Sequence, residues 1–462
     1  ELMTRDTSCH HHHAERAATM NKSPTPILAR RSVLTLAMTG ALGALAACGG
    51  DKEPAKASIS GTGSAPTTAN SPKITPVDGF SSTAAWSSTQ VKDLAPLVPV
   101  PEAGATWYQD RAWFLMATGT DPATGNRDVH IVALDPATKK VTVSPVVNKK
   151  LMDGTRTQWV TITHPSPALL LDTGGFSGGS VLVKLSGGTI TTTPLSVPSV
   201  DSFNAVWMGD VIFAIATRNG EGSGSFYDPT KNTYHTLAPQ HGGRIIGASV
   251  NGGKVMPLEL VGGTEGKPTT RLYANGHDAS SGIAGDEGQD RAIHAMAWTT
   301  NGKIVLSVDG PTNGDVIYVP YGTDLKPAAR GAYPRQGNPD RFDESSIGDE
   351  TQPQAISADR TQAILSNGLL YDTVQNKITR GIWTDPVTMS WDLNNTAVTT
   401  GHLYGNASSR NRDARVPTTG AYASTTGALT EQNQPNKTAP ALVLPNGDGL
   451  FLDEAAEVLA GS

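Results

Sequence analysis

The chain has 462 residues, 36 Lys and Arg against 42 Asp and Glu, a net charge of −6 and only two cysteines. A net negative charge argues against nucleic acid as the main partner, because binding to phosphates requires clustered positive side chains. Two cysteines exclude a disulfide framework, and 49 glycines with 17% charged residues favour an all-β domain rich in tight turns.

The N-terminal part of the chain carries an export pattern. Residues 20–31 begin with a methionine and end in Arg30-Arg31, and residues 33–45 are apolar or small without a charge. A basic segment followed by an apolar run too short to span a bilayer is typical of a secretory signal. We predict a signal peptide at 20–47, exported by the Sec or the twin-arginine route. Residues 1–19 are expected to be an unstructured upstream extension.

The apolar run ends in Leu45-Ala46-Ala47-Cys48, and no cysteine follows. This ending resembles the lipobox of bacterial lipoproteins, in which a peptidase cuts before the cysteine. The resemblance implies that Cys48 carries a diacylglyceryl group and anchors the protein to the outer side of the cell membrane, where two or more acyl chains give stable binding. Residues 48–77 are rich in Ser, Thr, Pro, Gly and Ala, which predicts a flexible tether.

From residue 78 to the C-terminus the chain repeats one theme, in which two apolar strands flank a tight polar turn. WTTNGKIVLSV (298–308) and LPNGDGLFLD (444–453) are two of eight such copies. Asn-Gly pairs supply the positive φ that short hairpin turns need. Seven copies are followed by a second hairpin, with turns near Asp135, Ser186, Asp228, Ala274, Tyr321, Asp372 and Ser424. A four-stranded unit about every 48 residues indicates a β-propeller.

We therefore predict an all-β fold in which residues 78–462 form a β-propeller of eight four-stranded blades, with seven blades as the alternative. The eighth copy leaves room for only one more strand, at 456–460, so its blade is incomplete. Residues 91–100 (VKDLAPLVPV) precede the first copy and have no partner of their own. We predict that this N-terminal strand pairs with the C-terminal strands and closes the ring, which removes an open sheet edge.

Three segments, ALDPATKKV (133–141), ISADRTQAIL (356–365) and LLYDTVQNKI (369–378), resemble repeats of quinoprotein-like, YVTN-like and WD40-like propellers. The resemblance implies the fold but no particular reaction, because propellers serve many functions. We expect a binding or protein-interaction scaffold in the cell envelope, with an envelope protein or a carbohydrate as partner and no nucleic acid. A propeller hydrolase, lyase or oxidoreductase with its site at the channel mouth is one alternative, and an extracellular solute sensor or capture module is another. No catalytic residue is predicted.

Charged side chains gather in the links between the outer strand of one predicted blade and the inner strand of the next. Such links end beside the central channel, so they would form one rim that could bind Ca²⁺ or a cationic or polyhydroxylated ligand. The alternative is that these loops are polar only because water surrounds them. The predicted rim residues are Asp153, Arg156, Asp201, His241, Arg244, Asp286, Glu287, Asp290, Arg291, Asp340, Arg341, Asp343, Glu344, Asp349, Glu350 and Asp385.

Overall fold

The computed structural model describes residues 74–119, 127–147, 157–173, 179–262, 271–280, 297–309, 315–327, 331–334, 353–365, 370–379, 389–399, 402–409, 420–425, 428–435 and 437–462. The chain divides into two units, residues 1–51 and 52–462, and every described residue belongs to the second. Cys48 and the predicted signal peptide therefore lie outside the described residues. Within the described ranges no helix is long and apolar enough to cross a membrane.

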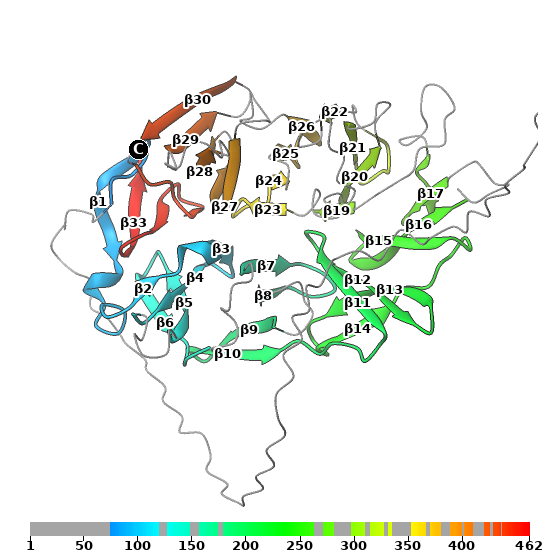
Figure 1. The fold of residues 1–462 in the computed structure, drawn as a ribbon, viewed down its shortest axis with the longest axis horizontal. Coiled ribbons are helices and arrows are strands. Elements are labelled where there is room, and N and C mark those ends of the chain that lie inside the picture. Colours follow the sequence, from blue (N-terminus) through cyan, green and yellow to red (C-terminus); the bar gives the residue numbers. More distant parts are fainter. Residues whose placement is uncertain are drawn as a thin grey trace, which may run out of the picture. The chain divides into compact units, whose positions relative to one another are not determined.

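The strands of the described ranges form eight antiparallel sheets (Figure 1). The first four sheets in chain order contain β2 (Val98–Pro99), β3 (Ala105–Tyr108), β4 (Arg111–Ala117), β5 (Val129–Asp135) and β6 (Lys140–Val143); β7 (Gln158–Ile162), β8 (Ala168–Asp172), β9 (Val181–Ser186) and β10 (Thr189–Pro194); β11 (Ser202–Trp207), β12 (Ile212–Arg218), β13 (Glu221–Asp228) and β14 (Thr233–Thr236); and β15 (Arg244–Asn251), β16 (Lys254–Val261), β17 (Arg271–Ala274) and β18 (His277–Asp278).

The other four sheets contain β19 (Ala297–Thr300), β20 (Lys303–Asp309), β21 (Asp315–Tyr321) and β22 (Gly331–Pro334); β23 (Pro353–Ile356), β24 (Gln362–Leu365), β25 (Leu370–Asp372) and β26 (Lys377–Thr379); β27 (Met389–Thr399), β28 (His402–Ser409), β29 (Gly420–Thr425) and β30 (Ala428–Pro435); and β31 (Leu442–Val443), β32 (Gly449–Leu452), β33 (Ala456–Gly461) and β1 (Phe80–Ser87). Two short 3₁₀ turns, η1 (Ser88–Gln90) and η2 (Pro101–Ala103), lie between the first strands.

Each sheet lies beside the next one along the chain. Neighbouring sheets contact each other through the strand pairs β3 with β7, β15 with β19, β23 with β27 and β27 with β31. Seven of the described sheets have four strands, and the sheet of β2–β6 has five because β3 also pairs with β4. Antiparallel sheets of this kind packed in chain order form a β-propeller, as the repeat predicts. The all-β prediction is confirmed.

The predicted second hairpins are confirmed at the level of single residues. Six of the predicted turn residues are the last residues of β5, β9, β13, β17, β21 and β25, and Ser424 is the last but one of β29. Two of these turns contain the same kind of tyrosine–asparagine hydrogen bond. Tyr227 Oη donates to Asn232 Oδ1 at 2.8 Å, and Tyr371 Oη donates to Asn376 Oδ1 at 2.6 Å. Both asparagines adopt positive φ, 50° and 51°, which asparagine tolerates better than most residues.

The prediction that residues 91–100 complete the last sheet is wrong. Val98 and Pro99 form β2, which pairs with β4, whereas the strand that pairs with β33 is β1, drawn blue beside the red β33 in Figure 1. The physical reason is the burial of aromatic rings. Phe80 of β1 packs edge-to-face on Phe451 with the ring centroids 5.3 Å apart, and Trp86 is 3% exposed.

The domain also begins before residue 78, where the tether was predicted to end. Ile74 and Val77 are buried, and the Val77 backbone N–H donates to the Thr438 carbonyl at 3.1 Å. These contacts attach the first described residues to the chain that leads into the last sheet.

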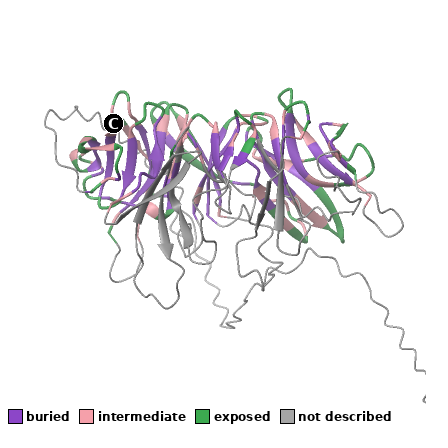
Figure 2. Cartoon of the chain, turned by 90° about the horizontal axis from the view of Figure 1, so that it is seen from above, coloured by how far each residue is buried: buried purple, intermediate pink, exposed green. Residues whose placement is uncertain are grey.

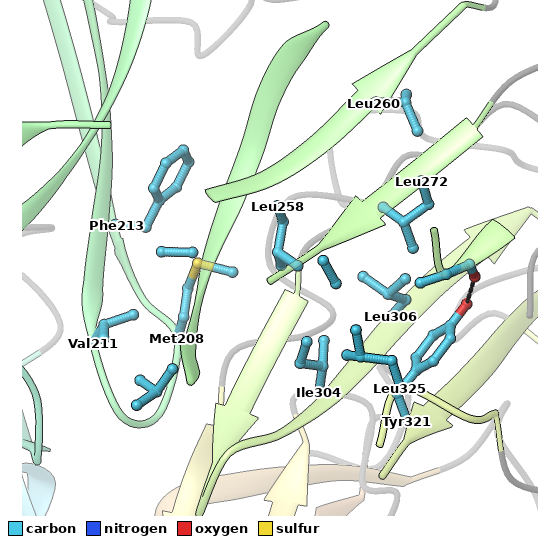
Figure 3. Close-up of a cluster of buried hydrophobic side chains, with 14 of the residues drawn as sticks. Met208, Val211, Phe213, Leu258, Leu260, Leu272, Ile304, Leu306, Tyr321 and Leu325 are labelled. Carbon is cyan, nitrogen blue, oxygen red and sulfur yellow. Dashed lines mark hydrogen bonds between the residues drawn. The ribbon is translucent and has the colours of Figure 1, made fainter. Parts of the chain in front are cut away.

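Burial follows the strands, and the exposed residues concentrate in the turns (Figure 2). One apolar cluster spans three sheets and includes Met208, Val211, Phe213, Leu258, Leu260, Leu272, Ile304, Leu306, Tyr321 and Leu325 (Figure 3). The Tyr321 hydroxyl in this cluster donates to the Ala279 carbonyl at 3.0 Å. Burial of each such aliphatic side chain stabilises a fold by about 1.5–3 kcal/mol. The cluster therefore holds these three sheets, and the turns above them, in fixed relative positions.

Candidate functional site

The antiparallel order of each sheet separates its connections into two sets. The turn from first to second strand and the turn from third to fourth strand lie at one end of the sheet, which we call the turn face. The turn from second to third strand and the link to the next sheet lie at the other end, the link face. The turn face is the upper edge in Figure 2, near the C-terminus. Of the predicted rim residues, Asp201, His241 and Arg244 are described, and they lie at the link face.

A cavity of about 360 Å³ opens on the turn face. Turns of four sheets line the part of it that the structure describes. The described lining residues are Thr163 and His164 after β7, Asp210 after β11, Val250 and Asn251 at the end of β15, Gly252 and Gly253 between β15 and β16, Asn275 after β17, Asn301 and Gly302 after β19, and Thr323 after β21.

Asp210 connects the lining of the cavity to two other sheets. Its backbone carbonyl accepts from the N–H groups of Thr163 and His164, both at 3.0 Å. The Thr163 hydroxyl donates to Asp210 Oδ1 at 2.9 Å and lies 2.9 Å from His164 Nδ1. Because the hydroxyl has one proton and gives it to Asp210, Nδ1 must be the donor in the second bond. His164 Nε2 is then an acceptor when the ring is neutral.

Arg360, in the turn between β23 and β24, reaches the same wall from a sheet distant along the chain. Its Nη2 lies 3.1 Å from Asp210 Oδ1, and its Nη1 donates to Thr161 Oγ1 at 2.9 Å. Asp210 is 1% exposed, so the ion pair compensates a charge that would otherwise be buried alone. In the described part of the chain, Asp210 Oδ2 and Arg360 Nε are buried without a hydrogen bond. The ion pair therefore connects the wall of the cavity to one further sheet, that of β23–β26.

The described part of the link face includes three predicted rim residues, Asp201, His241 and Arg244. His241 lies between β14 and β15, and Arg244 begins β15. Glu259 of β16 accepts backbone N–H bonds there from Gln240 at 2.8 Å, His241 at 2.9 Å and Gly243 at 2.5 Å. The His241 ring stacks on Tyr273 with the centroids 3.8 Å apart. Arg244 is exposed. The buried carboxylate therefore holds this link in place, and His241 is packed against the sheet.

Burial and hydrogen bonding act in opposite directions on the pKa of Glu259. Burial raises it, and the N–H bonds from Gly243, Gln240 and His241 outweigh burial and lower it below the usual value. The carboxylate therefore stays ionised in the folded protein at neutral pH.

The other predicted rim residues do not form a described site. The Asp201 carboxylate accepts the Asn219 backbone N–H at 2.6 Å and so stabilises a turn. Asp153, Arg156, Asp286, Glu287, Asp290, Arg291, Asp340, Arg341, Asp343, Glu344, Asp349, Glu350 and Asp385 lie outside the described residues. Within the described ranges, no three His, Cys, Asp or Glu side chains gather in a way that could hold a metal ion. The calcium rim stays a prediction.

The cavity on the turn face was missed by the sequence analysis. The available signal was the pair of Asn-Gly turns at Asn251-Gly252 and Asn301-Gly302, which were interpreted only as hairpin chemistry. No pattern in the sequence around Asp210 or Arg360 indicates that these two side chains form an ion pair.

No protein-family model and no curated protein matches the chain. Solved structures similar to it include the Dos1 propeller, 7% identical with a TM-score of 0.29, where the match covers 79% of this chain and 95% of that one. The β-propeller domain of the trilobed protease from Pyrococcus furiosus is 7% identical with a TM-score of 0.27, over 76% and 98%. A protein from Lactobacillus plantarum is 12% identical with a TM-score of 0.27, over 70% and 82%.

Proposed function

We propose that this β-propeller is a binding module of the bacterial cell envelope and that its ligand lies in the turn-face cavity. The observation that supports the proposal is the convergence of turns from four sheets on one cavity, whose described lining includes Thr, Asn, Asp and His side chains that can form hydrogen bonds. Concave sites with a few convergent polar groups are the usual place of a small ligand. The apolar cluster beneath and the Asp210–Arg360 ion pair give this cavity fixed walls.

The proposal includes the anchor. The lipobox-like ending at Cys48 and the low-complexity segment after it support a protein attached by lipid to the outer side of the cytoplasmic membrane. In that position the propeller would meet ligands of the envelope while remaining at the membrane.

We further propose that the eight sheets are the blades of one closed ring. Support comes from the antiparallel pairing of β1 with β33, which joins the two ends of the domain in one sheet. The Ser87 hydroxyl adds a contact to Glu457 Oε1 at 3.3 Å. A closed ring leaves no unpaired edge at the junction of the chain ends.

The binding proposal is tested by filling the cavity. Asn251 is exposed at the end of β15, and Asn251→Trp would place an indole in the cavity. Val374→Trp is the matched control, because Val374 is 70% exposed on the turn face between β25 and β26, outside the cavity. Thermal unfolding of the purified full chain is measured with glucose, N-acetylglucosamine, glutamate, putrescine and calcium chloride.

We expect at least one of these probes to raise the unfolding temperature of the wild type and of Val374→Trp, and to lose that effect in Asn251→Trp. A probe that stabilises all three proteins equally would show that the cavity is not its site. If no probe stabilises the wild type, the proposed binding function is wrong for these ligand classes.

A further inference from the structure

We infer that the turn-face cavity takes a neutral, polyhydroxylated ligand, a short carbohydrate rather than a cation or an anion. This inference rests on the proposed binding function and concerns the chemistry of the same site. It follows from three features of the cavity, which are its paired charges, its uncharged hydrogen-bonding groups and the accessible peptide groups of its glycine turn.

The charges at the cavity wall compensate each other. Among the lining residues that the structure describes, Asp210 has the one carboxylate, and the Arg360 guanidinium lies 3.1 Å from it. Asp210 is only 1% exposed, so its charge faces the protein and the guanidinium instead of the cavity. A free cation would have to compete with Arg360 for this carboxylate, and an anion would meet a guanidinium that is already paired.

The remaining polar groups both donate and accept hydrogen bonds. The exposed amides of Asn251 and Asn301 each carry a carbonyl oxygen and an NH₂ group. The Asn275 carbonyl oxygen accepts from the Ser249 hydroxyl at 2.6 Å, which leaves its NH₂ group as a donor. Uncharged groups that donate and accept in the same lining suit hydroxyl groups, since each hydroxyl can donate and accept.

The turn backbone leaves space for such a ligand. Gly252 and Gly253 adopt φ of 55° and 77°, and a Cβ atom at either position would meet nothing within 4 Å. At Gly302, φ is 74° and a Cβ would lie 3.5 Å from Thr323 Cγ2, at the side of the cavity. Peptide groups are therefore accessible at the Gly252-Gly253 turn, where a hydroxyl can reach the main chain.

The test removes one amide without straining its turn. Asn301 has φ of 50° and precedes Gly302, so Asn301→Gly keeps the turn and removes the side chain. Asn219→Gly is the matched control, because Asn219 has φ of 53°, precedes Gly220 and lies between β12 and β13 on the link face. Titration calorimetry of the full chain compares glucose, N-acetylglucosamine and trehalose with glutamate and putrescine.

We expect a neutral sugar to bind the wild type and Asn219→Gly alike, and to bind Asn301→Gly about three- to tenfold more weakly, the effect of one hydrogen bond. Binding of putrescine or glutamate in place of the sugars would overturn the neutral class while the cavity remained the binding site. Equal affinity of Asn301→Gly and wild type for a sugar would overturn the assignment of that sugar to the cavity. If none of the five probes binds, the proposed function fails together with this inference.

Discussion

Replacement of Glu259 by Gln should destabilise the domain, because the carboxylate is 1% exposed and is the acceptor for three backbone N–H groups. A glutamine has one acceptor oxygen, so its NH₂ group would face at least one of these donors and leave it without a partner. Hydrogen bonds to a charged group contribute about 1.5–3 kcal/mol, and a buried donor without a partner costs about 1–3 kcal/mol. We expect a loss of about 2–4 kcal/mol in the free energy of unfolding at neutral pH.

The loss should depend on pH in a defined direction. The pKa of Glu259 lies below its usual value of 4.5 in the folded protein, although burial alone would raise it. A carboxyl group of this kind stabilises the fold fully above its unfolded pKa, and the contribution disappears as the pH falls through the folded pKa. Wild type and Glu259→Gln should therefore differ most above about pH 5 and converge in more acidic solution.

The assay is urea unfolding followed by circular dichroism at about pH 7 and at a series of pH values below the usual pKa of glutamate. Glu454→Gln serves as the control, because Glu454 is exposed in the turn between β32 and β33. Equal unfolding midpoints of wild type and Glu259→Gln at neutral pH would refute the assigned role of the hydrogen bonds. A difference that stayed the same at acidic pH would refute the role of the charge.

Two further predictions concern the ends of the chain. Deletion of residues 74–87 should lower the thermal stability of the whole domain, because β33 would lose β1, one of its two paired strands, and Phe451 would lose its contact with Phe80. Unchanged unfolding would show that the last sheet does not need β1. Cys48→Ala should release the protein from membranes, since the lipid would be absent and no described helix could replace it as an anchor. A variant that still sediments with membranes after a high-salt wash would rule out the lipid anchor.

The positions of the hairpins could be predicted from the sequence because they depend on neighbouring residues. Asn301-Gly302 specifies a tight turn through the positive φ that these two residues tolerate, and the apolar residues beside it specify strands. The same local chemistry placed the end of β25 at Asp372, whose carboxylate accepts the Val374 backbone N–H at 2.8 Å. Turn chemistry and alternation therefore determined the repeat and, through it, the fold class.

Pairing between distant strands could not be predicted in the same way. Residues 91–100 and β1 both precede the first repeat, and no local pattern in either segment indicates its partner strand. Leu94 and Leu97 are buried in a turn, with the Leu94 backbone N–H bonded to the Val91 carbonyl at 2.9 Å. Only the packing of Phe80 and Trp86 in three dimensions decided the partner of β33.

The candidate site is the part that only the tertiary structure decided. Arg360 and Asp210 are separated by 150 residues, and neither has a neighbouring sequence that marks it as half of an ion pair. The sequence supplied the turns that surround the cavity, since each turn depends on its own few residues. The packing of whole sheets decides which turns lie together and which buried charges form an ion pair. Contacts between sheets depend on side chains that are distant along the chain.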